Sequence, residues 1–266
     1  MFKKYSLKEI KESLNKLNIK KKDIVYVSGN LVSFGKPEIK NLNDLPKIFF
    51  NEIYQLVGKE GTIMFPSHSF DLVNSNKIFD INKTKCISGS FSNYIIENKK
   101  FFRQIHPYAS IAGVGKYAKY ICNYKGNDVY GSSCPFEKLI NLQAKFISLG
   151  MKINKNCTQV HFLEKKFKVK YRFEKYFFHR ILLNNKVIRR KFSMFVLKNE
   201  YLNIKRNENK LIMSYFLKNY KIRKSKLGNN WIYSYDFKNF YNISKKLFKK
   251  NRNAWLGKNI NEKKSL

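Results

Sequence analysis

Hydrophobic positions in the first half of the chain alternate between helical spacing and strand spacing. A Ser-Leu-Lys-Glu capping box at Ser6 opens a helix whose apolar side chains share one face, namely Leu7, Ile10, Leu14 and Leu17. Further helical stripes cover residues 45–56, 90–98, 135–142 and the segment around His161. Short apolar runs between them predict strands at residues 23–28, 62–66, 109–115 and 145–150. This order predicts an α/β fold.

The pattern changes after Lys166. Residues 171–197 form two β-rich runs joined at Asn184-Asn185, which is a hairpin signal. A helix over 211–220, a second hairpin over 221–236 and a last helix over 237–248 complete the chain. With no Pro-, Gly- or Ser-rich linker and no repeat, residues 1–266 read as one domain. Its parts are a core (1–166), a β-rich and helical completion (167–250) and a polar tail (251–266), which we expect to be loose.

Charge adds a bias toward anionic partners. The chain has 54 Lys and Arg against 18 Asp and Glu, a formal net charge of +36. Nucleotides, coenzymes, nucleic acid and anionic membrane surfaces all suit this balance. The basic residues are nevertheless spread from Lys3 to Lys264, so a solvated surface without a dedicated partner is the alternative.

Cysteine spacing and apolar run length indicate a cytoplasmic protein. The four cysteines form no CxxC pair, which favours reduced thiols and no metal site. The N-terminus lacks the apolar stretch of a signal peptide. No run reaches the roughly 18 apolar residues that span a bilayer, although the charge could hold the protein at an anionic membrane.

Two polar turns follow predicted strands. Ser28, Gly29 and Asn30, with Leu31, come after the first strand, where N–H groups and hydroxyls could hold a phosphate or pantetheine group. The alternative is an ordinary strand-to-helix turn. Ser67-His68-Ser69 follows the second strand at the edge where open α/β sheets bind ligands.

Two histidines outside that turn are candidates for chemistry. His106 is followed by Pro107 and, four residues on, by Ser110. It is either a reactive histidine or a loop residue without a role. Thr158 is a good N-cap, so His161 and Glu164 fall three residues apart on one helical face. A carboxylate so placed orients an imidazole and stabilises its protonated form. The HxxE spacing lacks the second histidine of an HExxH zinc site.

Taken in order, these stretches resemble the antibiotic N-acetyltransferase family, the aminoglycoside 3-N-acetyltransferases and their relatives. The matching segments are VYVSGNLVSFG, GTIMFPSHS, HPYASIAGVGKYA, GSSCPFEKLINLQAKFISLG and TQVHFLE. They cover about residues 7–166. The resemblance implies a three-layer α/β/α sandwich with a β-rich C-terminal part and acetyl transfer from acetyl-CoA to a sugar amine, without a metal.

The resemblance also implies roles for the candidate residues. His161 looks like the general base, Glu164 its helical neighbour, with His106 as a further catalytic candidate. The turn Ser28, Gly29, Asn30 and Leu31, together with Ser110, looks like the coenzyme site, and Ser67, His68 and Ser69 are candidates for substrate contacts.

Two positions depart from the family pattern. The first turn is Ser-Gly-Asn where the family usually has His-Ser-Ser. Lys155 stands where the family tends to place an Asp six residues before the catalytic His. The orienting acid must therefore come from Glu164 or from a downstream residue such as Glu208.

The chemistry of the residues agrees with this function. A sugar ammonium must lose a proton before it attacks a thioester, and an imidazole with pKa near 6.5 suits that task. Because the chain is so basic, we expect a nucleotide-linked amino sugar of surface-polysaccharide synthesis as acceptor. The alternatives are an aminoglycoside-inactivating enzyme and, in another class, a basic nucleic-acid-binding protein. The last would want clustered basic and aromatic residues, which the sequence does not show.

Overall fold

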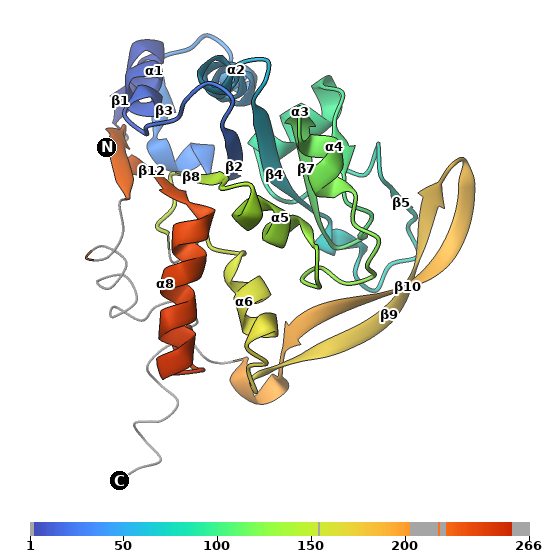
Figure 1. The fold of residues 1–266 in the computed structure, drawn as a ribbon. Helices are drawn as coiled ribbons and strands as arrows, with labels where there is room; N and C mark the ends of the chain where they lie inside the picture. The colour runs from blue at the N-terminus through green and yellow to red at the C-terminus, as the bar shows by residue number, and fades with distance from the viewer. Residues whose placement is uncertain (1–2, 154, 203–217, 219–221, 257–266) are drawn as a thin grey trace.

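A seven-stranded mixed sheet organises the molecule (Figure 1). The computed structural model describes residues 3–153, 155–202, 218 and 222–256. In sheet order the strands are β11 (Arg223–Leu227), β12 (Asn230–Asp236), β8 (Lys145–Leu149), β2 (Ile24–Gly29), β4 (Thr62–His68), β7 (Ala109–Gly115) and β6 (Phe102–Arg103). Strand β2 pairs in parallel with β8 and β4, and the other pairs are antiparallel. The carboxyl ends of β2, β4 and β8 therefore lie at one edge.

Helices cover both faces of this sheet. One layer holds α1 (Leu7–Asn15), α2 (Leu45–Val57) and α3 (Ser90–Asn98); the other holds α4 (Ala118–Cys122), α5 (Pro135–Asn141), α6 (Val160–Lys166) and α8 (Phe237–Lys250). Alternate residues of β2 belong to the two cores, with Val25 and Val27 on one side and Tyr26 on the other. The predicted three-layer α/β/α architecture is confirmed.

Local sequence signals explain several helix ends. Ser6 accepts from the Glu9 backbone N–H at 3.2 Å, and the Glu9 carboxylate accepts from the Ser6 N–H at 2.8 Å, so the capping box is present. Gly58 ends α2 with a positive φ of 70°. Two predictions were wrong. Leu7 is 50% exposed, and α6 begins after Gln159, so Thr158 contributes only a backbone carbonyl, which accepts from the His161 N–H.

A long hairpin is attached beside the sheet. Its strands, β9 (Arg172–Leu183) and β10 (Lys186–Leu197), form a curved arm in Figure 1, and β5 (Phe79–Asp80) pairs with β9. Asn184 and Asn185 both have positive φ (49° and 60°), as a two-residue type I′ turn requires, so the predicted hairpin is confirmed.

Short elements complete the described chain. These are β1 (Lys4–Tyr5), β3 (Lys36–Pro37) and the 3₁₀ helices η1 (Leu31–Phe34), η2 (Leu42–Asp44), η3 (Phe70–Leu72) and η4 (Asn199–Tyr201). Within the predicted tail over 251–266, Ala254, Trp255 and Leu256 are buried. The predicted helix over 211–220 lies, apart from residue 218, outside the described residues. None of the described helices has the length and apolar composition needed to cross a bilayer.

Candidate active site

His161 and Glu164 lie together on α6, as the sequence predicts. The imidazole Nδ1 is 2.5 Å from Oε2 of Glu164. Two further groups hold this carboxylate: the Tyr171 hydroxyl donates to Oε1 at 2.9 Å, and Nε of Arg172 lies 2.6 Å from Oε2. Glu164 is only 3% exposed. A buried carboxylate thus links a cation to the imidazole.

The electrostatics favour an ionised Glu164. Burial alone would raise its pKa, but His161, Arg172 and Tyr171 together hold it below the ordinary value. A charged carboxylate accepts a hydrogen bond from Nδ1–H of His161. This tautomer leaves Nε2 as the basic atom of the ring.

Three residues that complete this arrangement were missed in the sequence. They are Tyr171, Arg172 and Tyr130, whose ring packs edge-on against the His161 imidazole with centroids 5.8 Å apart. Lys155, at the position of the family's Asp, is exposed. Glu208, the other acid considered, lies outside the described residues.

The turn after β2 is held tightly. A Cβ on Gly29 would lie 2.0 Å from the Leu149 carbonyl oxygen, so only glycine fits. The Asn30 N–H donates to that same carbonyl at 2.8 Å, and the Asn30 side chain caps η1 through the Val32 N–H at 3.1 Å. The Ser28 carbonyl accepts from Asn156 at 3.0 Å. These bonds fix the backbone that leads into Leu31, which is buried.

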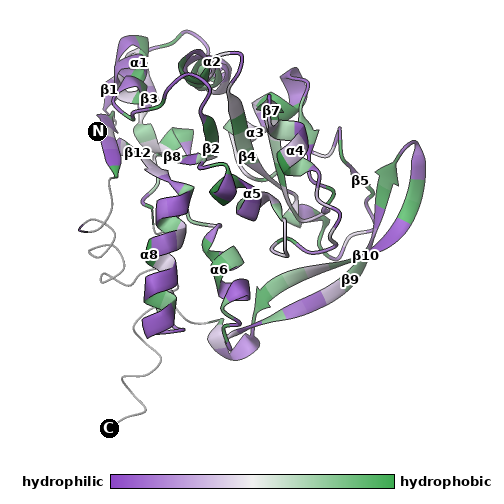
Figure 2. Ribbon diagram, in the orientation of Figure 1, coloured by the Kyte–Doolittle hydropathy of each residue, from purple (hydrophilic) through white to green (hydrophobic). Residues whose placement is uncertain are grey.

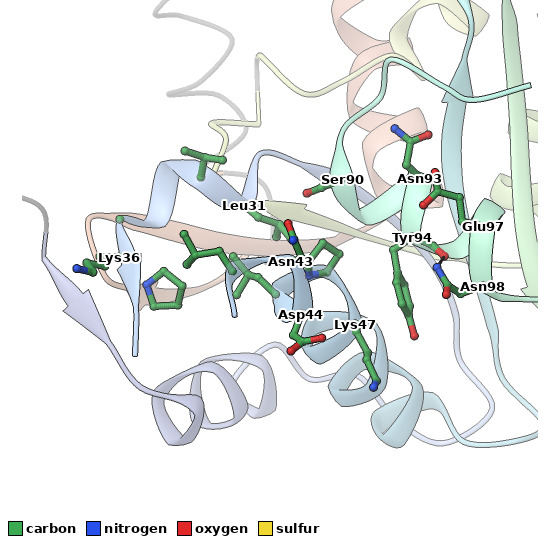
Figure 3. Close-up of a pocket in the computed structure, with 16 residues that line it drawn as sticks. Leu31, Lys36, Asn43, Asp44, Lys47, Ser90, Asn93, Tyr94, Glu97 and Asn98 are labelled. Atoms are coloured by element: carbon green, nitrogen blue, oxygen red, sulfur yellow. Dashed lines mark hydrogen bonds between the residues drawn. The ribbon is translucent and has the colours of Figure 1, made fainter. Parts of the chain in front are cut away.

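Leu31 lines a cleft of about 950 Å³ between the segment after β2, the start of α2 and one face of α3. Figure 3 shows Ser90, Asn93 and Glu97 of α3 on one side and Asn43, Asp44 and Lys47 on the other. Lys36 and Lys47 are the cations of the lining.

The cleft adjoins the turn at Gly29. Gly89 is the N-cap of α3 and has no side chain to cap the helix. It lies next to Gly29, since a Cβ added to Gly89 would be 3.6 Å from the Gly29 carbonyl oxygen. The carboxyl end of β2 and the N-terminus of α3 therefore meet.

His68 ends β4 beside the segment that leads into α3. Its backbone N–H donates to Ser88 Oγ at 2.9 Å, which ties the end of β4 to the segment leading into α3. Burial, followed by the charges of His161 and Arg103, lowers the pKa of His68 to about 4. His68 is thus neutral near pH 7.

The predicted ligand contacts Ser67, Ser69 and Ser110 are internal instead. All three are fully buried, and the Arg103 guanidinium donates to the Ser67 carbonyl (2.7 Å), Ser69 Oγ (2.8 Å) and Ser110 Oγ (2.9 Å). Burial lowers the pKa of Arg103 to about 10, so it remains charged at pH 7. The Ser69 and Ser110 hydroxyls thus accept from Arg103, and the Ser67 hydroxyl contacts that of Ser110 at 2.9 Å. Buried and engaged in this way, the three hydroxyls are unsuited to contact the coenzyme or the acceptor.

His106 is also a structural residue by its contacts. Its Nδ1 accepts from the backbone N–H groups of Tyr108 (3.3 Å) and Ala109 (3.1 Å), so Nε2 carries the proton and donates to the Ser193 carbonyl at 3.1 Å. Both nitrogens are used and the ring is fully buried, which lowers its pKa to about 4. Its geometry does not favour a catalytic role. Among the described residues no group of three metal-binding side chains is found.

Comparison with known proteins yields one family and one fold. The family model described as aminoglycoside 3-N-acetyltransferase matches residues 34–249, well over half of the chain. This match confirms the resemblance inferred from the motifs. No curated protein sequence matches the chain.

Several solved structures share the fold at low sequence identity. YokD from Bacillus subtilis is 18% identical, with a TM-score of 0.76 over 98% of this chain and 97% of its own. Aminoglycoside acetyltransferase AAC(3)-IIb is 16% identical, with a TM-score of 0.76 over 93% and 97%. AAC-IIIb, in a binary complex with CoASH, is 16% identical, with a TM-score of 0.77 over 93% and 97%.

Proposed function

The chain belongs to the aminoglycoside 3-N-acetyltransferase family, and from this premise we propose that it transfers the acetyl group of acetyl-CoA to an amine on a sugar ring. The observation that carries the proposal is the Arg172–Glu164–His161 chain, in which the buried carboxylate contacts Nδ1 of the imidazole at 2.5 Å. Such a chain orients a general base and stabilises its protonated form.

In the reaction His161 Nε2 removes a proton from the acceptor ammonium. The freed amine attacks the thioester carbonyl, so a C–N bond forms and the C–S bond breaks. The proton held by His161 then passes to the departing thiolate, which regenerates the neutral base. The acylated nitrogen releases its second proton to solvent, so the products are the amide, the CoA thiol and one proton. Glu164 stays ionised throughout because Arg172 and Tyr171 hold it.

The cleft beside Leu31 is our candidate for the coenzyme. Lys36 and Lys47 suit the phosphates of CoA, and the apolar part of the lining suits its pantetheine arm. The relative AAC-IIIb was solved with CoASH, which supports a coenzyme site on this fold. The turn at Gly29 and the start of α3 adjoin this cleft, and Ser88, just before α3, accepts from the His68 N–H at 2.9 Å. Ser28, Gly29, Asn30 and Leu31 therefore stay in the proposed site, whereas Ser110 does not.

For the acceptor, family and relatives favour an aminoglycoside over the nucleotide-linked amino sugar expected from charge. The family description names aminoglycosides, and the relative AAC-VIa was solved with sisomicin bound. The family also disfavours the nucleic-acid-binding alternative.

One observation keeps the nucleotide-linked sugar as a second candidate. Acidic side chains around α6 already have basic partners: Asp128 and Glu174 contact Lys165, and Glu137 lies 3.4 Å from Lys166. A polycationic acceptor would have to compete with these lysines.

Release of CoA from acetyl-CoA, measured with a panel of aminoglycosides and nucleotide-linked amino sugars, tests the proposal. Turnover of aminoglycosides is the expected result. Turnover restricted to sugar nucleotides would select the second candidate. If no amine in either set is acetylated while acetyl-CoA still binds, the proposed acceptor class is wrong.

A further inference from the structure

The outer face of the β9–β10 hairpin is exposed and basic. Six exposed side chains share this face by the strand register, and we call them the hairpin face: Tyr176, Phe178, Arg180, Val187, Arg189 and Lys191. Tyr176 is 62% exposed, Phe178 57% and Val187 50%, and the three basic residues are exposed as well. The inner face carries Phe177 and Ile181, which pack in a small core with Phe79, Tyr108 and Phe192.

Glu174, at the start of β9, is the one acidic residue of the two strands, and it contacts Lys165 at 2.9 Å rather than the cations of this face. Arg180 pairs directly with Arg189 across the two strands, and like charges in that position destabilise a ribbon. Between residues 175 and 194 the sequence has no Asp or Glu but six basic residues, Lys175, Arg180, Lys186, Arg189, Arg190 and Lys191. An anionic surface laid on this face would relieve the repulsion.

Aromatic rings alternate with these cations, so the hairpin brings together basic and aromatic side chains whose clustering was not expected from the sequence. The Arg189 guanidinium lies 4.8 Å from the ring centre of Phe178, and the Lys191 ammonium 4.6 Å from that of Tyr176. Both rings remain exposed beside these cations rather than packing in the core. Amphipathic rings and long basic side chains in this mixture suit the boundary between lipid headgroups and acyl chains.

The tip of the hairpin adds aliphatic surface. Val187 and Ile188 follow the polar turn and are 50% and 38% exposed, and Figure 2 shows hydrophobic stretches on both sides of the hydrophilic turn. Nucleic acid would use the aromatic rings for stacking but gains little from exposed aliphatic chains. A lipid surface uses both.

We propose that the hairpin face binds the surface of an anionic lipid bilayer. The cations bind the headgroups, and Tyr176, Phe178 and Val187 insert at the level of the headgroups. This contact is independent of the acetyl-transfer site.

Binding of the purified full chain to vesicles tests the proposal. Vesicles of phosphatidylcholine with about one-third phosphatidylglycerol should bind the protein, pure phosphatidylcholine vesicles should not, and high salt should release it. Arg189→Gln with Lys191→Gln should weaken binding about 25-fold, since each basic side chain near an anionic bilayer contributes about fivefold. Tyr176→Ser with Phe178→Ser should weaken it about tenfold through lost apolar contact.

Two matched controls separate the hairpin face from general charge. Lys249→Gln with Lys250→Gln removes the same charge from the last turn of α8, and Tyr120→Ser removes a ring that is 56% exposed with Lys138 over it at 4.7 Å. Both controls should stay within about twofold of the parent protein, because charges beyond a Debye length are screened. Thermal unfolding of every variant verifies that it is folded.

Three results would overturn the proposal: absence of vesicle binding, equal loss in the α8 control, or tight binding of single-stranded RNA that the hairpin variants lose while vesicles stay unbound. The last would assign the face to nucleic acid.

Discussion

Replacing Glu164 by Gln should destabilise the protein strongly although the two side chains have nearly the same shape. Glu164 is 3% exposed and Arg172 8% exposed, and the Arg172 Nε lies 2.6 Å from the carboxylate. Glutamine leaves that guanidinium buried without its carboxylate. Removing one partner of a buried ion pair costs about 3–5 kcal/mol, so we expect the free energy of unfolding to fall by about 3 kcal/mol or more.

Urea unfolding at pH 7.5, followed by tryptophan fluorescence, measures this change. The matched control is Glu137→Gln, because Lys166 is 3.4 Å away with its side chain 46% exposed, and an exposed pair contributes less than about 1 kcal/mol. The double variant Glu164→Gln with Arg172→Met should be more stable than Glu164→Gln alone, since it leaves no uncompensated buried charge. If Glu164→Gln and Glu137→Gln cost the same, or if the double variant equals the sum of its single variants, the ion-pair reasoning is refuted.

Three further predictions concern stability and coenzyme binding. The folded-state pKa of His106 is about 4 against an ordinary 6.5, so the unfolded chain binds more protons between these values. The contribution of His106 to the free energy of unfolding is therefore complete above pH 6.5 and is lost as the pH falls toward 4, a loss of about 3 kcal/mol. In urea unfolding measured over this pH range, His106→Gln should show a smaller decrease than the parent protein. Arg103→Met should cost about 3 kcal/mol in urea unfolding, because it removes the buried guanidinium bonds to the Ser67 carbonyl and to the Ser69 and Ser110 hydroxyls. Arg103→Lys should recover only part of this loss, and equal stability of all three proteins would contradict the prediction. Gly29→Ala should weaken acetyl-CoA binding, measured by calorimetry, at least about tenfold. The added Cβ would lie 2.0 Å from the Leu149 carbonyl oxygen and would shift the turn. Unchanged affinity would place the coenzyme elsewhere.

Local patterns were enough to predict most of the core. Helix α3 has the predicted bounds Ser90–Asn98, and the hairpin turns at Asn184-Asn185, because periodicity, capping and turn chemistry act over a few residues. The His161–Glu164 pair was predictable for the same reason, since one helical turn brings both side chains together.

The rest of the site depends on long-range contacts that periodicity does not encode. Ser67 was expected just after a strand and Ser110 within one, and both were expected to face a ligand. Instead, Arg103 of the edge strand β6 donates hydrogen bonds to the Ser67 carbonyl and the Ser110 hydroxyl. An arginine within an apolar run, FFRQI, was the available signal for a buried cation. Arg172 was missed because it is the first residue of β9, and only the turn after α6 brings it beside Glu164.

The central claim is that His161 removes the proton from the acceptor amine. The direct measurement is steady-state CoA release by His161→Ala beside the parent protein, with acetyl-CoA affinity determined separately by calorimetry. We predict that kcat falls by about 10²- to 10⁴-fold, the usual contribution of a general base, while acetyl-CoA affinity stays within about twofold. Turnover near that of the parent protein would contradict the assignment of His161 as the base.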